Sequence, residues 1–368
     1  MIVLIPSYKR TDVLNAVIRS VLNCDLSHID ERVLVVIVNN YYPNRNIIES
    51  IIANFSWPFR VEFETIHRKK TIPPVDSWFS AIFGIAEEDE VVFLLGDDDL
   101  LLPWGLKNRY LRIKESNADM LLSDYQGQLY FYDGGKKCWL DGELPSPPSD
   151  NIATLPWDYL PNTHPNASFM SNHCYRNTKC FREGYEIAME WSRRQSWVPI
   201  AIASGNVPFY MAYAIKSAVR AGTVVSYQEK SVIRGSVVEQ TFKQDYADGG
   251  NTAFFGLLIF NTFANESLHD DISSFSGLRQ IYARSFIKNA VSVLPNDNVP
   301  LGMLYKTMKL SGITLWHFFN PSVLGNLYSV LRMLPFLRGF RIKRSIKNGN
   351  FILVDSFMGK LNNQQLKG

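Results

Sequence analysis

The sequence predicts an α/β protein in which a mostly parallel sheet is flanked by helices and a mainly helical region follows. Strand and helix signals alternate through the first hundred residues, and the predicted strands are continuous apolar runs, as parallel strands buried on both faces require. From residue 246 onward, apolar residues recur at helical spacing. With 368 residues, of which 46% are hydrophobic and 20% charged, the chain can bury a sizeable core.

The first hundred residues alternate four strands with helices. The predicted strands are IVLIP, VLVVIVNN, VEFETI and VVFLL, at residues 2–6, 33–40, 61–66 and 91–95. The stretch TDVLNAVIRSVLNC predicts a helix after the first strand, with Thr11 and Asp12 as its expected cap, and VDSWFSAIFGIA has helical periodicity before the fourth strand. This order predicts a doubly wound sheet with right-handed crossovers.

The chain then continues the pattern less regularly. We expect a helix, a strand, a hairpin, a further strand and a second helix, at residues 106–117, 119–125, 127–140, 169–181 and 182–194. A proline-rich stretch at 141–166 predicts a long irregular loop, of the kind that is often functional. Because helical spacing predominates from residue 246 onward, we place a domain boundary near residue 240.

Composition and charge exclude several classes of protein. A formal net charge of +3 is too small to require a nucleic acid partner. The four cysteines show neither CxxC spacing nor the density of a disulfide scaffold, so we expect reduced thiols in the cytoplasm and no zinc site. The apolar residues 2–5 run directly into Pro6 without the features of a signal peptide, and the longest uncharged window, 249–265, is short for a membrane span.

Polar residues follow the predicted strands at their carboxyl ends, where parallel sheets bind ligands. They are Ser7, Tyr8, Asn39, Asn40 and the triplet Asp97, Asp98 and Asp99. Three adjacent carboxylates repel one another and need a cation or solvent. Mg²⁺ or Mn²⁺ with a nucleotide diphosphate would meet this need, and a solvated turn rich in aspartate is the alternative. The sequence has neither GxGxxG after the first strand nor GxxxxGK[ST] to hold phosphates.

Two stretches of the sequence resemble the signatures of family 2 glycosyltransferases. IVLIPSYKRTDVLNAVIRSVLNC is similar to the opening of that family, where a hydrophobic strand runs into P-[ST]-[YF]-[NK]-R and then a helix. AIFGIAEEDEVVFLLGDDDLLLP is similar to its second signature, in which a strand leads into a DxD-type cluster that is followed by a proline. The two stretches occur in the family's order, and the resemblance covers about the first 130 residues.

The resemblance implies a GT-A fold and transfer of a sugar from a nucleotide-sugar donor. It makes residues 1–130 the nucleotide-sugar-binding half of the GT-A domain and residues 131–240 the acceptor-binding half, with 241–368 a helical C-terminal region. It places the nucleotide against Pro6, Ser7, Tyr8, Arg10, Asn39, Asn40 and Asp97, and Mn²⁺ or Mg²⁺ on Asp98 with Asp99 as a second ligand. In the family, the second strand usually ends in an Asp that reads the base. Asn39 departs from this pattern and calls the usual uridine preference into question.

The remaining site residues are predicted from their chemistry and position. Lys69, in the basic run after the third strand, could face the diphosphate or belong to a solvated turn. An inverting transfer needs a carboxylate that takes the proton of the acceptor hydroxyl, and Glu190 or Glu186 would share one helix face in the expected region, with ordinary solvated positions as the alternative. The acceptor candidates are Trp157, His164 and His173, for which a surface loop or a local hydrogen bond is the alternative.

The C-terminal segment at 330–347 places Arg and Lys among Leu, Met, Phe and Ile, the composition of a basic helix on an anionic membrane surface. A core helix with basic edges or a homo-oligomer contact is the alternative. We therefore expect a cytoplasmic enzyme, peripheral on the inner face of the cytoplasmic membrane, with a saccharide or polyprenyl-linked acceptor.

The predicted function is a metal-dependent glycosyltransferase of hexosyl or deoxyhexosyl type, in bacterial polysaccharide or O-antigen synthesis by family analogy. One rival is a nucleotidyltransferase, which would be expected to carry a glycine-rich basic loop after the first strand, whereas IPSYKRT has no glycine. The other rival is a non-catalytic carbohydrate- or membrane-binding module with a degenerate site.

Overall fold

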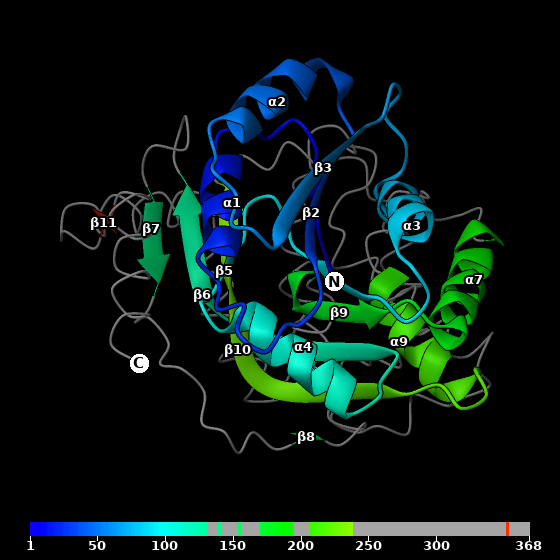
Figure 1. Cartoon of the computed structure of the whole chain (residues 1–368). Helices are drawn as coiled ribbons and strands as arrows, with labels where there is room; N and C mark the ends of the chain where they lie inside the picture. Colours follow the sequence, from blue (N-terminus) through cyan, green and yellow to red (C-terminus); the bar gives the residue numbers. More distant parts are fainter. Residues whose placement is uncertain (132–137, 142–153, 156–169, 195–206, 238–350, 353–368) are drawn as a thin grey trace, which may run out of the picture.

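The computed structural model of the chain describes residues 1–131, 138–141, 154–155, 170–194, 207–237 and 351–352 (Figure 1). Its strands, with bounds in chain order, are β1 (Ile2–Ser7), β2 (Val33–Asn39), β3 (Val61–His67), β4 (Val91–Leu94), β5 (Leu100–Leu101), β6 (Met120–Phe131), β7 (Cys138–Asp141), β8 (Thr154–Leu155), β9 (His173–Arg176), β10 (Val224–Val237) and β11 (Phe351–Ile352). They form one sheet with the order β11-β7-β6-β9-β4-β1-β2-β3, and β10 pairs with β5, β6 and β8 beside this path.

The central part of the sheet is mostly parallel, as the sequence predicts. Strands β3, β2, β1 and β4 pair in parallel with one another, β9 lies antiparallel between β4 and β6, and β10 pairs in parallel with β6. Six of these seven central strands therefore run in one direction, and β9 alone runs the other way. The expected hairpin is also present, because Leu129 of β6 pairs with Leu140 of β7 in antiparallel register.

Helices cover both faces of the sheet. On one face, side chains such as Val3, Ile5 and Phe93 pack against α1 (Leu14–Leu22), α2 (Arg45–Ala53) and α4 (Gly105–Glu115). On the other face, the alternating residues, including Ile2 and Leu4, pack against α3 (Pro74–Ile85), α7 (Lys179–Arg194) and α9 (Val207–Ser217). Because side chains alternate along a strand, burial on both faces explains why these strands are continuous apolar runs.

Two local boundaries differ from the sequence prediction. Helix α1 begins after Val13 without a side-chain cap, so the expected cap at Thr11 and Asp12 is not formed. Strand β9 is shorter than the expected 169–181, since it follows a 3₁₀ turn, η3 (Met170–Asn172), and α7 starts at Lys179 rather than at 182. The hydroxyl of Thr178 accepts a hydrogen bond from the Phe181 N–H at 3.1 Å and so supplies the cap that starts this helix early.

The register of the parallel strands brings their carboxyl ends together. Ser7 at the end of β1 lies opposite Asn39 at the end of β2, and Asn39 lies opposite His67 at the end of β3. The loop after β4 carries the acidic triplet, and the N–H of Leu95 donates to the carbonyl of Leu4 at 2.9 Å. The polar residues predicted at the strand ends therefore share one edge of the sheet.

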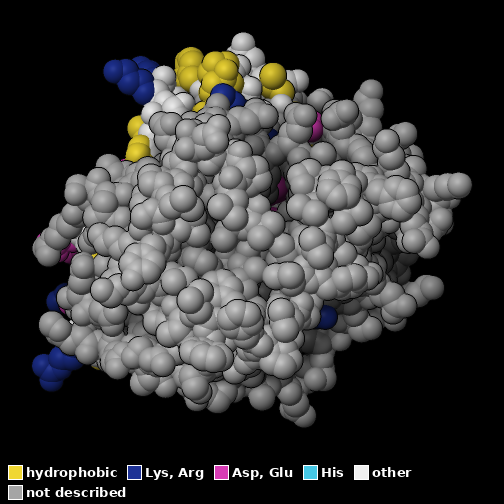
Figure 2. All heavy atoms as spheres, turned by 180° about the vertical axis from the view of Figure 1, so that it is seen from behind, with side chains coloured by type: hydrophobic (Ala, Val, Ile, Leu, Met, Phe, Trp, Pro, Cys, Tyr) yellow, Lys and Arg dark blue, Asp and Glu magenta, His cyan; other side chains and the backbone are white. Residues whose placement is uncertain are grey.

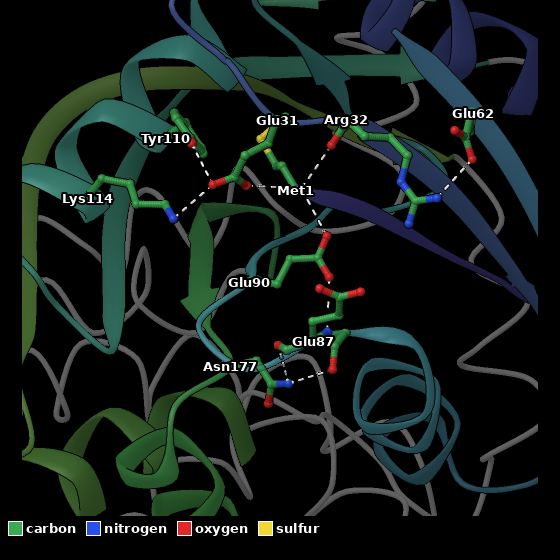
Figure 3. A network of polar contacts seen from close by, with 10 residues as sticks. Met1, Glu31, Arg32, Glu62, Glu87, Glu90, Tyr110, Lys114 and Asn177 are labelled. Carbon is green, nitrogen blue, oxygen red and sulfur yellow. Dashed lines mark hydrogen bonds and ion pairs between the residues drawn. The ribbon is translucent and has the colours of Figure 1, made fainter.

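A polar network around Met1 lies at the amino ends of the parallel strands, opposite the end that carries the acidic triplet (Figure 3). The amino group of Met1 donates to the carbonyl of Arg32 at 2.9 Å, to Glu90 at 3.0 Å and to Glu31 at 3.3 Å. Glu31 also accepts hydrogen bonds from Tyr110 on α4 at 2.8 Å, and Lys114 lies 2.9 Å away. The network joins β1, α4 and the loop before β4 at the edge remote from the acidic triplet.

Among the described residues, the large hydrophobic side chains that are exposed are Tyr42, Ile47 and Phe59. Ile47 lies on α2, Tyr42 shortly before it, and Phe59 in the loop between α2 and β3. Figure 2 shows hydrophobic and basic side chains gathered at the end of the molecule where α2 lies in Figure 1. No helix within the described ranges is long and apolar enough to cross a membrane. The predicted C-terminal segment at 330–347 and most of the predicted region 241–368 lie outside the described residues.

Candidate active site

The acidic triplet stands in the short loop between β4 and β5, at the carboxyl edge of the sheet. The three carboxylates differ in exposure: Asp97 and Asp99 are each 1% exposed, whereas the side chain of Asp98 is 14% exposed. A carboxylate buried without a partner is costly, so each buried side chain requires donors from the protein. The structure supplies different donors to the two ends of the triplet.

Arg10 forms ion pairs with the first two carboxylates. Its guanidinium lies 2.5 Å from Asp97 and 2.7 Å from Asp98, and the N–H of Tyr8 donates to Asp97 at 3.3 Å. The turn after β1 is held because the Ser7 hydroxyl donates to the Arg10 carbonyl at 3.0 Å. Ser7 and Pro6 are themselves buried in the strand. The turn after β1 therefore places the Arg10 cation beside the acidic loop.

Burial and charge act together on these groups. Burial raises the pKa of Asp97 to about 7, while Arg10 acts in the opposite direction and Asp98 in the same direction. For Arg10, burial alone would lower the pKa, but the nearby carboxylates Asp97, Asp98 and Asp99 raise it well above its usual value. The Arg10 guanidinium therefore stays charged over the whole accessible pH range.

Asp99 faces the protein interior. One of its carboxylate oxygens accepts a hydrogen bond from the hydroxyl of Ser171 in η3, and the other accepts from the N–H of Gly235 in β10 at 2.8 Å. The sequence predicts Asp99 as a second metal ligand, and in the structure each of its oxygens accepts a hydrogen bond from the protein. Of the triplet, Asp98 is the carboxylate that combines partial exposure with a position at the sheet edge.

The amides at the end of β2 are engaged in holding the fold. The amide of Asn40 donates to the carbonyl of Ile72 at 2.7 Å and accepts from its N–H at 3.1 Å, which ties the loop before α3 to the sheet. The side-chain oxygen of Asn39 accepts a hydrogen bond from the Tyr41 N–H at 3.0 Å, and the side-chain nitrogen of Asn39 lies 3.1 Å from Nδ1 of His67. Both side chains are buried. The predicted nucleotide contact of Asn39 and Asn40 thus competes with structural hydrogen bonds.

An aromatic pair lies next to this edge. The rings of Tyr8 and Tyr41 meet edge to face with centroids 5.9 Å apart, and the Lys9 ammonium lies 5.3 Å from the centre of each ring. Lys9 has a φ of 59°, a left-handed conformation that the tight turn after β1 imposes. Lys69, two residues past the end of β3, is exposed. These groups provide aromatic surface and positive charge beside the acidic loop.

The other predicted site residues are dispersed. Glu186 and Glu190 are exposed on α7, whose Arg193 lies 3.7 Å from Asp76 in the first turn of α3. His173 is completely buried in β9 with its Nδ1 3.0 Å from the Tyr175 hydroxyl, which agrees with the alternative of a local hydrogen bond. Trp157 and His164 lie outside the described residues.

Sequence reasoning did not identify Ser171 or Gly235 as partners of the acidic loop. Gly235 carried a detectable signal, because a glycine inside a strand often marks a close approach of another backbone. Ser171 carried none, because a buried serine in a turn resembles many others. Ser171 lies 72 residues from Asp99 in the sequence, so no local pattern connects the two.

The residues present accommodate a divalent cation through Asp98. Mg²⁺ is usually held by one or two protein carboxylates, with waters and substrate phosphates completing its coordination, so a single partly exposed Asp is compatible with this pattern. Among the residues that the structure describes, no group of three or more His, Cys, Asp or Glu side chains could hold a metal by itself.

Comparison with known proteins establishes the fold. No family profile and no curated protein sequence matches the chain. Among solved structures, S. aureus TarS 1–349 superposes with a TM-score of 0.50 at 14% identity, covering 93% of this chain and 91% of that one. The same protein in complex with UDP-GlcNAc superposes with a TM-score of 0.52 over the same shares of the two chains, also at 14% identity. TarS is a GT-A glycosyltransferase of the family 2 type, and the present chain has the GT-A fold that its sequence predicts.

Proposed function

We propose that the chain is a metal-dependent glycosyltransferase that moves a sugar from a nucleotide-sugar donor to a hydroxyl of a saccharide or lipid-linked saccharide acceptor. The observation that carries this proposal is the partly exposed Asp98 beside Arg10 at the carboxyl edge of a GT-A sheet. The crystal structure of TarS in complex with UDP-GlcNAc supports a nucleotide sugar as the donor class.

Each group at the sheet edge has a role in donor binding under this proposal. Tyr8 and Tyr41 offer aromatic surface for the base, and Lys9 and Lys69 offer charge for the phosphates. Asp97 and Asp98 orient the Arg10 guanidinium, whose paired donors suit a phosphate. A cation bound at Asp98 would supply the charge that stabilises the leaving diphosphate.

The nucleotide preference does not follow from Asn39. Its amide is buried and bonded within the fold, so its replacement of the family's aspartate does not decide between uridine and other bases. TarS binds UDP and UDP-GlcNAc, according to its structures, which makes UDP the first nucleotide to test.

For the general base, the geometry favours Glu190 over Glu186. Arg193 at the end of α7 reaches Asp76 at the start of α3, and α3 begins next to the carboxyl edge of β3. Glu190 lies within one turn of that contact, whereas Glu186 lies a further turn away. In an inverting reaction Glu190 would take the proton from the acceptor hydroxyl.

The cellular role is proposed by analogy. A hexosyl or deoxyhexosyl transfer in bacterial polysaccharide or O-antigen synthesis, at the inner face of the cytoplasmic membrane, agrees with the fold and with the basic C-terminal composition. A saccharide or polyprenyl-linked acceptor would be consistent with that location.

Calorimetric titration of the full chain with UDP, GDP, CDP and dTDP, with and without Mn²⁺, tests the proposal. We expect one nucleoside diphosphate to bind more tightly when Mn²⁺ is present, and the Asp98→Asn variant to lose this increase. Absence of metal-dependent binding for all four nucleotides would overturn the proposal and leave the non-catalytic module. Release of pyrophosphate from a sugar-1-phosphate and a nucleoside triphosphate would instead identify a nucleotidyltransferase.

A further inference from the structure

We propose that Ser171 and Gly235 are positioning residues that hold the acidic loop, through Asp99, so that Asp98 faces the donor. Both residues belong to the second half of the domain, far in sequence from the loop that they contact. The inference rests on the proposed function, since it concerns the same site. It assigns Asp99 the task of anchoring the loop in place of binding the cation.

Ser171 satisfies both ends of the loop with one hydroxyl. Its Oγ accepts a hydrogen bond from the N–H of Gly96 at 2.7 Å and donates to the carboxylate of Asp99. Ser171 is completely buried, so no water competes for these contacts. Gly96 and Asp99 are therefore both hydrogen-bonded to the Ser171 hydroxyl oxygen, and Asp97 and Asp98 lie between them in the loop.

Arg109 of α4 fixes Ser171 in turn. Arg109 is 2% exposed, and its guanidinium donates to the carbonyl of Ser171 at 2.6 Å and lies 6.0 Å from the centre of the Phe93 ring in β4. A buried arginine is costly unless it is well placed. The contact therefore ties η3 to the strand that precedes the acidic loop.

Gly235 anchors the loop from the other side. Its N–H donates to Asp99 at 2.8 Å, and a Cβ at this position would lie 1.5 Å from the carbonyl oxygen of Asp98. No side chain fits at that distance, so glycine is required for the backbone of β10 to approach the loop. Asp99 thus accepts one hydrogen bond from η3 and one from β10.

This arrangement couples the donor site to the half of the domain that the sequence assigns to the acceptor. The parallel strands β1 and β4 supply Arg10 and the acidic triplet, but η3 and β10 determine the direction in which the triplet points. The Asp98 carboxylate is therefore oriented only when the second half of the domain is packed against the first.

The test compares Ser171→Ala with Ser20→Ala in the full chain. Ser20 is a matched control, because its buried hydroxyl accepts from the N–H of Leu101 at 3.1 Å and donates to Val17 without touching the acidic loop. We expect Ser171→Ala to lose about tenfold in the Mn²⁺-dependent increase of nucleotide affinity, measured as the ratio of the affinities with and without Mn²⁺. Ser20→Ala should keep the full increase at a similar loss of thermal stability.

A double-mutant cycle tests whether Ser171 and Asp99 act as one unit. If Asp99 acts through Ser171, the Ser171→Ala/Asp99→Asn variant will bind Mn²⁺ and nucleotide no more weakly than Asp99→Asn alone. Additive losses, or an unchanged metal increase in Ser171→Ala, would overturn the inference.

Amide hydrogen exchange distinguishes failure of this inference from failure of the proposed function, because it needs no ligand. We expect exchange at Gly96 to accelerate at least about tenfold in Ser171→Ala relative to Ser20→Ala, as a lost buried hydrogen bond implies. Unchanged exchange at Gly96 would refute the anchor even if the wild-type chain bound no nucleotide. Accelerated exchange without nucleotide binding would uphold the anchor and reject the glycosyltransferase.

Discussion

The two sides of the acidic loop differ in what they contact. On the outer side, the partly exposed Asp98 and the buried Asp97 share one cation, Arg10, from the turn after β1. On the inner side, Asp99 accepts neutral hydrogen bonds from Ser171 and Gly235 in the second half of the domain. Adjacent residues of one motif therefore have separate tasks, because a sharp loop sends successive side chains to different surroundings.

The contrast shows how the fold accommodates three adjacent carboxylates that repel one another. One guanidinium pairs with two carboxylates at 2.5 and 2.7 Å, and backbone and hydroxyl donors satisfy the third in the interior. The outer pair can exchange the guanidinium for a metal ion without disturbing the interior contacts of Asp99.

The largest effect is expected on the outer side. Asp98→Asn should reduce sugar transfer at least about hundredfold, since it removes the carboxylate proposed to hold the cation. The thermal midpoint should stay within about 2 °C, because this side chain is partly exposed and fills no core position. A turnover assay and a melting curve check both parts, with the exposed Asp12→Asn as the control. Retained turnover in Asp98→Asn would move the metal role to another residue.

On the inner side, the effect should fall on stability. Asp99→Asn should lower the free energy of unfolding by about 1–3 kcal/mol, because an amide cannot accept from both the Ser171 hydroxyl and the Gly235 N–H. Urea unfolding of Asp99→Asn and Asp98→Asn in parallel measures the contrast. Equal stability of the two variants would remove the distinction between the sides of the loop.

Arg10→Lys should produce a smaller effect that manganese partly reverses. One ammonium cannot reproduce the pair of contacts that the guanidinium makes to Asp97 and Asp98, so we expect a loss of about 1 kcal/mol in the free energy of unfolding. Added Mn²⁺ should recover part of this loss by neutralising the outer carboxylates, and should not recover the loss in Asp99→Asn. Melting curves with and without Mn²⁺ decide this, and equal recovery in both variants would contradict it.

The smallest effect is expected for Glu31, a carboxylate in the network around Met1 that serves as a reference outside the acidic loop. Although partial burial alone would raise the pKa of Glu31, hydrogen bonds from Lys114 and Tyr110 lower it below its usual value. The stability that Glu31 contributes is therefore present above about pH 4.5 and is lost as the pH falls through its lowered folded-state value. Glu31→Gln should cost less than about 1 kcal/mol at pH 7, and the difference from wild type should vanish in acid. A constant difference between pH 7 and pH 3 would show that the carboxylate charge is not involved.

Much of the donor side could be predicted from local patterns. The strands β1 to β4 appear where apolar runs occur, and Ser7, Asn39 and His67 meet at one edge because parallel strands in register end together. Predictions were weaker where partners are distant in sequence. The amides of Asn39 and Asn40 look like ligand-reading groups in isolation, but the loop before α3 occupies much of their hydrogen-bonding capacity.

The sequence alone determined the alternation of strands and helices, the position of the acidic triplet after a buried strand, and the presence of Arg10 one turn beyond the first strand. These features follow from hydrophobic periodicity and turn chemistry, which act over a few residues. Tertiary structure alone decided which aspartate faces outward and which is anchored, since that choice depends on Ser171, Arg109 and Gly235, more than 60 residues from their partners or in a strand that approaches from the other half of the domain. A buried hydrogen bond needs its donor and acceptor at contact distance, and no local pattern records which distant backbone will supply the other half.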